Sequence, residues 1–286
     1  MNLDLRIPLK MVTVYSMCLF ASSCPNKGFV NEKAMSKTPL PLPKILELRS
    51  PNKTLLYFGT YHSNNRKDTL FERINFEFNR LRPSYILHEG DNNWPIYRSM
   101  DSTILISGEP GYIIKKAQEN NLPYSNLEPP LLLEFSALNH HFDKKDIVLM
   151  YVCRQIGQLQ RLNEVALITD VEFENKMSVF LDYLSNQGIA LTEEELNFSF
   201  WKEVFEAFFE ESLEWRRFDP ANYYPNFFKN CLNEISRASD TYRNKFMVKK
   251  IVNSLKKYDK VMVLVGGGHL RQQEEKIKQA FQKMFH

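Results

Sequence analysis

The chain has 286 residues, of which 43% are hydrophobic and 25% charged, as in an ordinary globular protein. Its 37 basic and 34 acidic residues leave a formal net charge of +3. This balance, together with the lack of a Lys/Arg cluster interleaved with aromatic residues, argues against nucleic acid as a partner.

Residues 1–24 have the pattern of a signal peptide. A positively charged start precedes the apolar run 11–21, and small residues and Cys24 follow it. The run is shorter than the roughly 20 residues that a helix needs to span a bilayer. Ala21-Ser22-Ser23-Cys24 resembles a bacterial lipobox, in which Cys24 becomes the lipidated first residue. We therefore expect export to the periplasmic or cell-surface face of a bacterial membrane, with a lipid anchor at Cys24. An ordinary secretory signal and an N-terminal anchor are the alternatives.

Residues 25–44 predict an extended tether, because three prolines in the span 38–43 are incompatible with a helix interior. The folded body, 45–286, is then expected to form a single domain. It retains two cysteines, Cys153 and Cys231. An oxidising compartment would permit a disulfide between them, and the sequence leaves this open.

A strand–helix–strand unit opens the body. Residues 54–58 predict a short buried strand that leads into Gly59-Thr60-Tyr61-His62, and apolar residues at helical spacing predict a helix over 69–82. Residues 85–87 predict the next strand, which runs into His88-Glu89-Gly90. Strand, helix and strand within about 35 residues are typical of a βαβ unit with parallel strands and a right-handed crossover.

The pattern continues with Gly108-Glu109-Pro110, whose proline suits the first turn of a helix. Residues 124–127 predict a third short strand, which ends at Glu128. From 131 to 257 the apolar residues recur at helical spacing without a convincing strand. This predicts a mostly helical insertion between the third and the last core strand, with Asp240 at the start of its final long helix.

The last strand is the apolar run 260–265, which Gly266-Gly267-Gly268-His269 and a helical pattern follow. A continuous apolar strand is typical of the centre of a parallel sheet, where both faces are buried. We expect the glycines to turn tightly with positive φ and to approach a ligand closely. A tight corner without a ligand is the alternative. The predicted fold class is α/β, with a mostly parallel central sheet and flanking helices.

Four polar side chains share one position relative to their strands, at or just beyond the carboxyl end. They are His62, Glu89, Glu128 and His269. Because the carboxyl ends of parallel strands meet at one edge of a sheet, where ligands bind, these side chains should converge. Two imidazoles and two carboxylates suit a divalent metal ion or acid–base catalysis. A cap or turn role is the alternative for each residue alone, but their coincidence favours a site.

Several motifs resemble those of the TraB/PrgY/TIKI/GumN family, whose wider superfamily includes erythromycin esterases and haem-binding ChaN lipoproteins. Those of the family are Gly59-Thr60-Tyr61-His62, Glu89-Gly90, Arg243-Asn244 and Gly266-Gly267-Gly268-His269; Gly108-Glu109 and Leu127-Glu128-Pro129 resemble elements of the esterase-like relatives. The resemblance covers about residues 54–286. In this chain Asn244 stands where the family often has an acidic residue.

The resemblance implies a metal-dependent hydrolase acting on a peptide or a small-molecule ester, with a divalent metal ion as cofactor. The implied metal ligands are His62, His269 and Glu89; the implied catalytic residues are Glu89, Arg243, Glu128 and Glu109. Glu89 would act as general base or as third ligand, and Arg243 would stabilise developing oxyanion charge.

Three alternatives to this function stay open. Within catalysis, His62 and Glu89 could support ester hydrolysis without a metal. Outside catalysis, the chain could be a ChaN-like surface lipoprotein that binds haem or another ligand without turnover. It could also be a degenerate member that keeps the turns for folding alone.

Overall fold

A computed structural model describes residues 43–90, 96–161 and 167–285. The signal peptide, Cys24 and all but the end of the tether lie outside these residues. Within the described part of the chain, no helix is long and apolar enough to cross a membrane.

The centre of the fold is a five-stranded sheet with the order β1-β2-β5-β3-β4. Its strands are β1 (Lys44–Arg49), β2 (Thr54–Thr60), β3 (Tyr85–His88), β4 (Tyr124–Asn126) and β5 (Lys260–Gly266). Strands β2 to β5 pair in parallel, and β1 pairs antiparallel with β2. The α/β class and the mostly parallel sheet are therefore confirmed. The antiparallel edge strand β1 was not predicted, and its first residue, Lys44, had been assigned to the tether.

Strand β5 lies in the middle of the sheet although it comes last in the chain. It pairs with β2 on one side and with β3 on the other, and Val261–Val265 are fully or almost fully buried. The register puts Thr60 of β2 opposite Gly266 and His88 of β3 opposite Leu264. The carboxyl ends of these strands therefore meet at one edge of the sheet.

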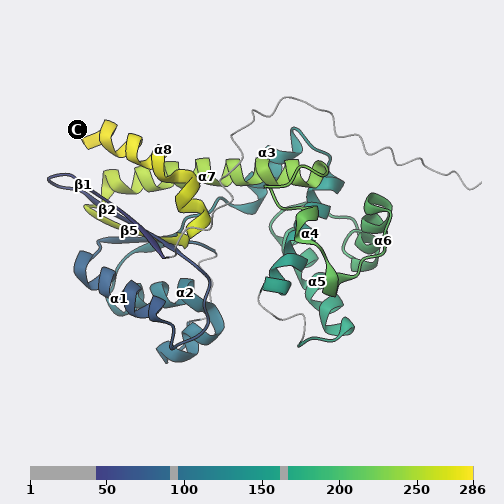
Figure 1. The fold of residues 1–286 in the computed structure, drawn as a ribbon, viewed down its shortest axis with the longest axis horizontal. Coiled ribbons are helices and arrows are strands. Elements are labelled where there is room, and N and C mark those ends of the chain that lie inside the picture. The colour runs from purple at the N-terminus through teal and green to yellow at the C-terminus, as the bar shows by residue number, and fades with distance from the viewer. Residues whose placement is uncertain (1–42, 91–95, 162–166, 286) are drawn as a thin grey trace, which may run out of the picture.

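Helices cover both faces of the sheet (Figure 1). Helices α1 (Thr69–Leu81) and α2 (Met100–Glu119) pack on one face through a core that includes Phe58, Ile74 and Ile113. Helices α7 (Cys231–Lys257) and α8 (Gly267–Phe285) pack on the other. Helix α2 starts earlier than predicted and is kinked at Gly108, whose φ of 55° departs from helical geometry.

The described residues between β4 and β5 contain helices and no strand, as the sequence predicts. They are α3 (Leu131–Asn139), α4 (Lys144–Arg161), α5 (Asp170–Asn186), α6 (Phe198–Phe209), the 3₁₀ turns Trp215–Arg217 and Pro220–Asn222, and α7. Helices α3 to α6 and the start of α7 enclose a separate hydrophobic core around Trp201 and Tyr151.

Helix α7 contributes both to the helical core around Trp201 and to the core on its own face of the sheet (Figure 1). Its 27 residues reach about 40 Å at 1.5 Å per residue. Leu232 and Ile235 near its start belong to the helical core, whereas Met247 and Ile251 pack on the sheet. The middle of α7, including Arg243, therefore lies where the helical core and the sheet meet.

Two details differ from the sequence-based expectations, and a third was left open by the sequence. Helix α7 begins at Cys231 because Asn230 caps it, its side chain accepting from two backbone N–H groups; Asp240 is an interior residue and not the start. The glycines from Gly266 to Gly268 do not adopt positive φ. The open point was a disulfide between the two cysteines of the body: the Cys153 thiol is buried and free, so it forms none with Cys231.

Candidate functional site

Glu89 lies at the edge of the sheet, directly after β3. Its backbone N–H donates to the Leu264 carbonyl at 3.1 Å, which extends the pairing with β5 by one residue. Its carboxylate Oε2 accepts from the Gly266 N–H at 2.5 Å. A Cβ at residue 266 would sit 3.1 Å from that oxygen, so glycine is the residue that admits this close contact. The glycines were expected to approach a ligand closely; in the structure the group that lies against Gly266 is the Glu89 carboxylate.

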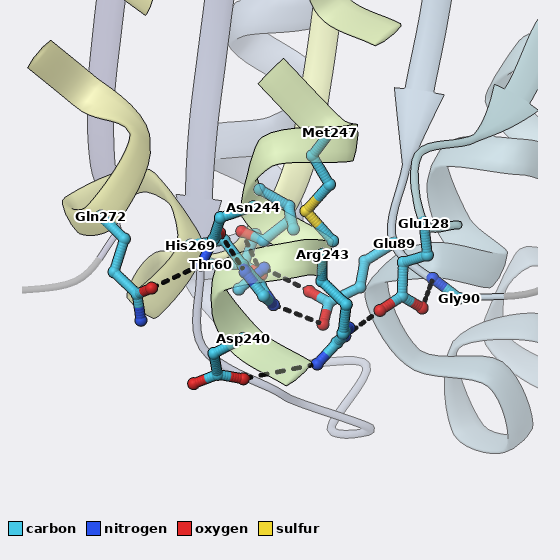
Figure 2. A network of polar contacts seen from close by, with 12 residues as sticks. Thr60, Glu89, Gly90, Glu128, Asp240, Arg243, Asn244, Met247, His269 and Gln272 are labelled. Atoms are coloured by element: carbon cyan, nitrogen blue, oxygen red, sulfur yellow. Dashed lines mark hydrogen bonds and ion pairs between the residues drawn. The ribbon is translucent and has the colours of Figure 1, made fainter. Parts of the chain in front are cut away.

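His269 projects from the first turn of α8 toward the same place (Figure 2). Its Nδ1 lies 2.9 Å from Oδ1 of Asn244 on α7, and its Nε2 lies 3.7 Å from Oε1 of Glu89. Helix α8 begins at Gly267 and can approach β2 closely because Gly59 has no side chain: a Cβ there would lie 3.1 Å from the Gly267 Cα. The glycines of both GxxH motifs therefore bring α8, β2 and Glu89 together.

Glu128 and Arg243 form an ion pair beside Glu89 (Figure 2). The Glu128 carboxylate also accepts from the Gly90 N–H at 3.2 Å. The backbone N–H of Glu128 donates to Oδ1 of Asn126. Arg243 lies 3.9 Å from Asp240, measured from Nη1 to Oδ1. Its main partner is thus Glu128, and Asp240, three residues earlier on α7, is a more distant second.

His62 and Glu109 form a second pair at the same edge. Nδ1 of His62 lies 2.7 Å from Oε1 of Glu109, and the second carboxylate oxygen accepts from the Ser63 N–H at 3.3 Å. Glu109 is 3% exposed, while the His62 side chain is 64% exposed. The kink at Gly108 turns α2 so that the buried carboxylate holds an imidazole that solvent can reach.

The electrostatics favour an ionised Glu89 beside a neutral His269. Burial by itself would raise the pKa of Glu89, but His269 when it is protonated, the Arg243 charge and the Gly266 N–H together hold it below its usual value. Burial lowers the pKa of His269 to about 4 despite the neighbouring Glu89, and the Arg243 charge adds to the decrease. At neutral pH the site therefore presents a carboxylate and an uncharged imidazole, the forms in which both residues bind metals.

Glu89, Glu128 and His269 could hold a metal ion. One donor atom from each lies within 4.8 Å of the others. Two carboxylates and one imidazole are ligands that divalent transition-metal ions accept. The Arg243 guanidinium, paired with Glu128, compensates one of the two carboxylate charges, and a bound cation would balance the other. The donor atoms and the charge balance therefore suit a divalent metal ion.

The sheet edge thus brings together the residues that the sequence placed there, in two groups. Glu89, Glu128, His269 and Arg243 form the first group, and His62 with Glu109 forms the second. His62 lies outside the set of donor atoms that approach within 4.8 Å, and Glu128 takes its place there. The role of His62 as a metal ligand stays a prediction.

Two buried polar residues behind His269, linked to it through Asn244, were missed in the sequence. Gln273 is fully buried and donates to Asn244, and Tyr57 in turn donates to Gln273. The sequence did contain a signal: Gln273 falls at helical spacing between the apolar residues Leu270 and Ile277, so a polar side chain interrupts a buried face of the helix.

Comparisons with models of known protein families, with curated proteins and with solved structures find no match to this chain.

Proposed function

We propose that this chain is an exported, lipid-anchored hydrolase of the TraB/TIKI type that cleaves peptide or ester bonds with the help of a divalent metal ion. The observation that carries the proposal is the convergence of Glu89, Glu128 and His269 within 4.8 Å at the carboxyl edge of a parallel sheet. Three elements distant in sequence contribute these side chains, so local structure alone does not explain their meeting.

The ligands in this proposal are Glu89, Glu128 and His269, with His62 as a further candidate. A bound divalent ion supplies Lewis acidity, which polarises a carbonyl group and makes a water molecule easier to deprotonate. Where Glu89 serves as general base and not as a ligand, its ionised carboxylate accepts that proton, although its lowered pKa makes it a weaker base than an ordinary glutamate.

Arg243 would stabilise the negative charge that develops on the carbonyl oxygen during hydrolysis. Its guanidinium is held by Glu128 and lies close enough to Glu89 for their charges to interact. A fixed cation in a largely buried site stabilises developing charge without reorganising, which is where oxyanion stabilisation is strongest.

Glu109 would orient His62 for proton transfer. Because Glu109 accepts at Nδ1, the opposite ring nitrogen is the one that can exchange a proton with substrate or leaving group. A buried carboxylate, an imidazole and an adjacent electrophilic site form the arrangement of orienter, base and reacting centre that acyl-transfer enzymes use.

The helices between β4 and β5 are, in this proposal, an insertion into a TraB-like α/β body. The supporting observation is that they enclose a hydrophobic core of their own, separate from the two cores that flank the sheet. The export and lipid-anchor proposals rest on the N-terminal sequence pattern, and replacement of Cys24 by serine, followed by membrane fractionation, tests them.

The metal proposal is tested by calorimetric titration of chelator-treated full-length protein with Zn²⁺ and Mn²⁺. We expect about one equivalent to bind to the unchanged protein. Glu89→Gln and His269→Gln should weaken binding at least tenfold, while Glu77→Gln, a matched change at a buried glutamate paired with Arg80, should not. If neither ion binds, or if Glu77→Gln weakens binding equally, the metal site is refuted.

The hydrolase proposal needs a separate measurement. A panel of chromogenic esters and unstructured peptides should reveal turnover, and Glu89→Gln should reduce it by roughly 10²–10⁴-fold. Alanine at His62 or His269 should have a similar effect while the circular dichroism spectrum stays unchanged. If all three variants keep full turnover, the assignment of the site is wrong; if the unchanged protein binds metal but cleaves nothing in the panel, the binding-only alternative gains support.

A further inference from the structure

A buried chain of hydrogen bonds leads from the sheet to His269. The Tyr57 hydroxyl on β2 donates to Oε1 of Gln273 on α8 at 2.9 Å. Nε2 of Gln273 donates to Oδ1 of Asn244 at 2.6 Å and reaches the sulfur of Met247 at 3.1 Å. Tyr57 and Gln273 are fully buried and Asn244 is 6% exposed, so water does not compete for these contacts.

The donors and acceptors of this chain can be arranged in one consistent direction. If the Gln273 amide were reversed, its oxygen would face both the Asn244 oxygen and the Met247 sulfur, neither of which donates. If Asn244 were also reversed, its oxygen would face Oε1 of Gln272, to which its nitrogen now donates. Reversal of the Gln273 amide would also take away the oxygen to which the Tyr57 hydroxyl donates. A buried donor without an acceptor costs about 1–3 kcal/mol.

The direction of the chain decides which nitrogen of His269 carries the proton. Asn244 presents its carbonyl oxygen, which can only accept, so Nδ1 of His269 at 2.9 Å must be the donor. At a pH above the ordinary histidine pKa of about 6.5, the neutral ring has a single N–H. Nε2 is then the nitrogen with a lone pair, and it is the one that faces Glu89.

We propose that Tyr57, Gln273 and Asn244 are positioning residues that hold His269 as its Nδ1–H tautomer, so that Nε2 points a lone pair into the site. Outer hydrogen-bond partners of ligating histidines commonly fix ring orientation and tautomer in this way. The part of this proposal that concerns a metal ligand rests on the proposed function, whereas the tautomer itself does not.

The tautomer is tested by ¹⁵N NMR of the imidazole nitrogens at pH 8 in full-length, metal-free protein labelled at histidine. His269 is identified by the signal that disappears in His269→Asn. We expect a protonated Nδ1 and an unprotonated Nε2 in the unchanged protein. Asn244→Asp keeps an acceptor at this place and should preserve that pattern, whereas Asn244→Leu and Gln273→Met should produce a mixture of tautomers. A proton on Nε2 in the unchanged protein overturns the proposal, as does an unaltered pattern in both apolar variants.

Tyr57→Phe offers a milder variant if the apolar changes prevent folding. It removes only the hydroxyl, and we expect a detectable population of the second tautomer; an unchanged spectrum would exclude Tyr57 from the positioning chain. Zn²⁺ affinity measured on the same variants should fall roughly 10–100-fold where the tautomer is lost and stay within a few fold in Asn244→Asp. If Zn²⁺ does not bind the unchanged protein, the metal proposal fails while the NMR result still decides the positioning role.

Discussion

The glycines of the two GxxH motifs make different contacts, so alanine should have a different effect at each. At Gly59 the new Cβ would lie 3.1 Å from the Gly267 Cα and 3.1 Å from a Leu270 methyl carbon. A backbone atom cannot yield easily, so Gly59→Ala should lower the free energy of unfolding by about 1–3 kcal/mol. At Gly268 no atom of the described residues lies within 4 Å of the added Cβ. Gly268→Ala in α8 should therefore be neutral or stabilise by up to about 1 kcal/mol.

Gly266 separates the effect on the site from the effect on stability. A Cβ there would meet only the Glu89 carboxylate among the described residues, at 3.1 Å, and φ is not positive at this residue. The carboxylate can shift by a few tenths of an ångström, so the free energy of unfolding should change by less than about 1 kcal/mol. That shift disturbs the 2.5 Å hydrogen bond to the residue 266 N–H, which fixes Glu89 in the site. We therefore expect Zn²⁺ affinity to fall about tenfold or more in Gly266→Ala.

Urea unfolding followed by circular dichroism, and calorimetric titration with Zn²⁺, measure the two quantities on the same three variants. We expect a loss of stability in Gly59→Ala, a loss of affinity in Gly266→Ala and neither in Gly268→Ala. Equal unfolding free energies for Gly59→Ala and Gly268→Ala would refute the close packing of α8 on β2. Unchanged affinity in Gly266→Ala would refute the role of this glycine in placing Glu89.

Three further predictions concern titratable groups. Because burial lowers the pKa of His269 to about 4, the unfolded chain binds a proton between about pH 6.5 and 4 that the folded chain does not. In the presence of chelator, the stability of the unchanged protein relative to His269→Gln should therefore fall by up to about 3 kcal/mol from pH 7 to pH 4. Burial raises the pKa of Asp240 to about 6, so the stability relative to Asp240→Asn should change with the opposite sign, rising as the pH falls. Equal signs in the two comparisons would contradict one of the two assignments. Burial also raises the pKa of the Cys153 thiol, so it should resist a thiol reagent in the folded protein and react after unfolding in urea. Rapid modification under native conditions would show that Cys153 is accessible.

The sequence by itself determined the elements whose pattern is local and strong. The apolar runs of β2, β3 and β5 and the helical spacing of α1 were sufficient to predict these elements within a residue or two. The polar residues at the strand ends followed from the same pattern, because parallel strands share a carboxyl edge. The residue pattern alone therefore grouped Glu89, Glu128 and His269, together with His62, which the structure places outside the closest set of donor atoms.

The tertiary structure decided what depends on contacts between distant residues. Placement of β5 between β2 and β3 brings Gly266 against Glu89, and no local pattern encodes strand order. The pairing of Glu109 with His62 depends on the kink at Gly108, and the pairing of Glu128 with Arg243 depends on where α7 crosses the sheet edge.

The glycine-rich turn after β5 illustrates the difference most clearly. Three glycines before His269 were expected to supply positive φ, yet α8 starts at once with ordinary helical geometry. Their small size is what the fold uses: Gly267 packs against Gly59, and Gly266 admits the Glu89 carboxylate. A sequence shows that a side chain is missing at a position, but only the packed structure shows which atoms occupy the space it leaves.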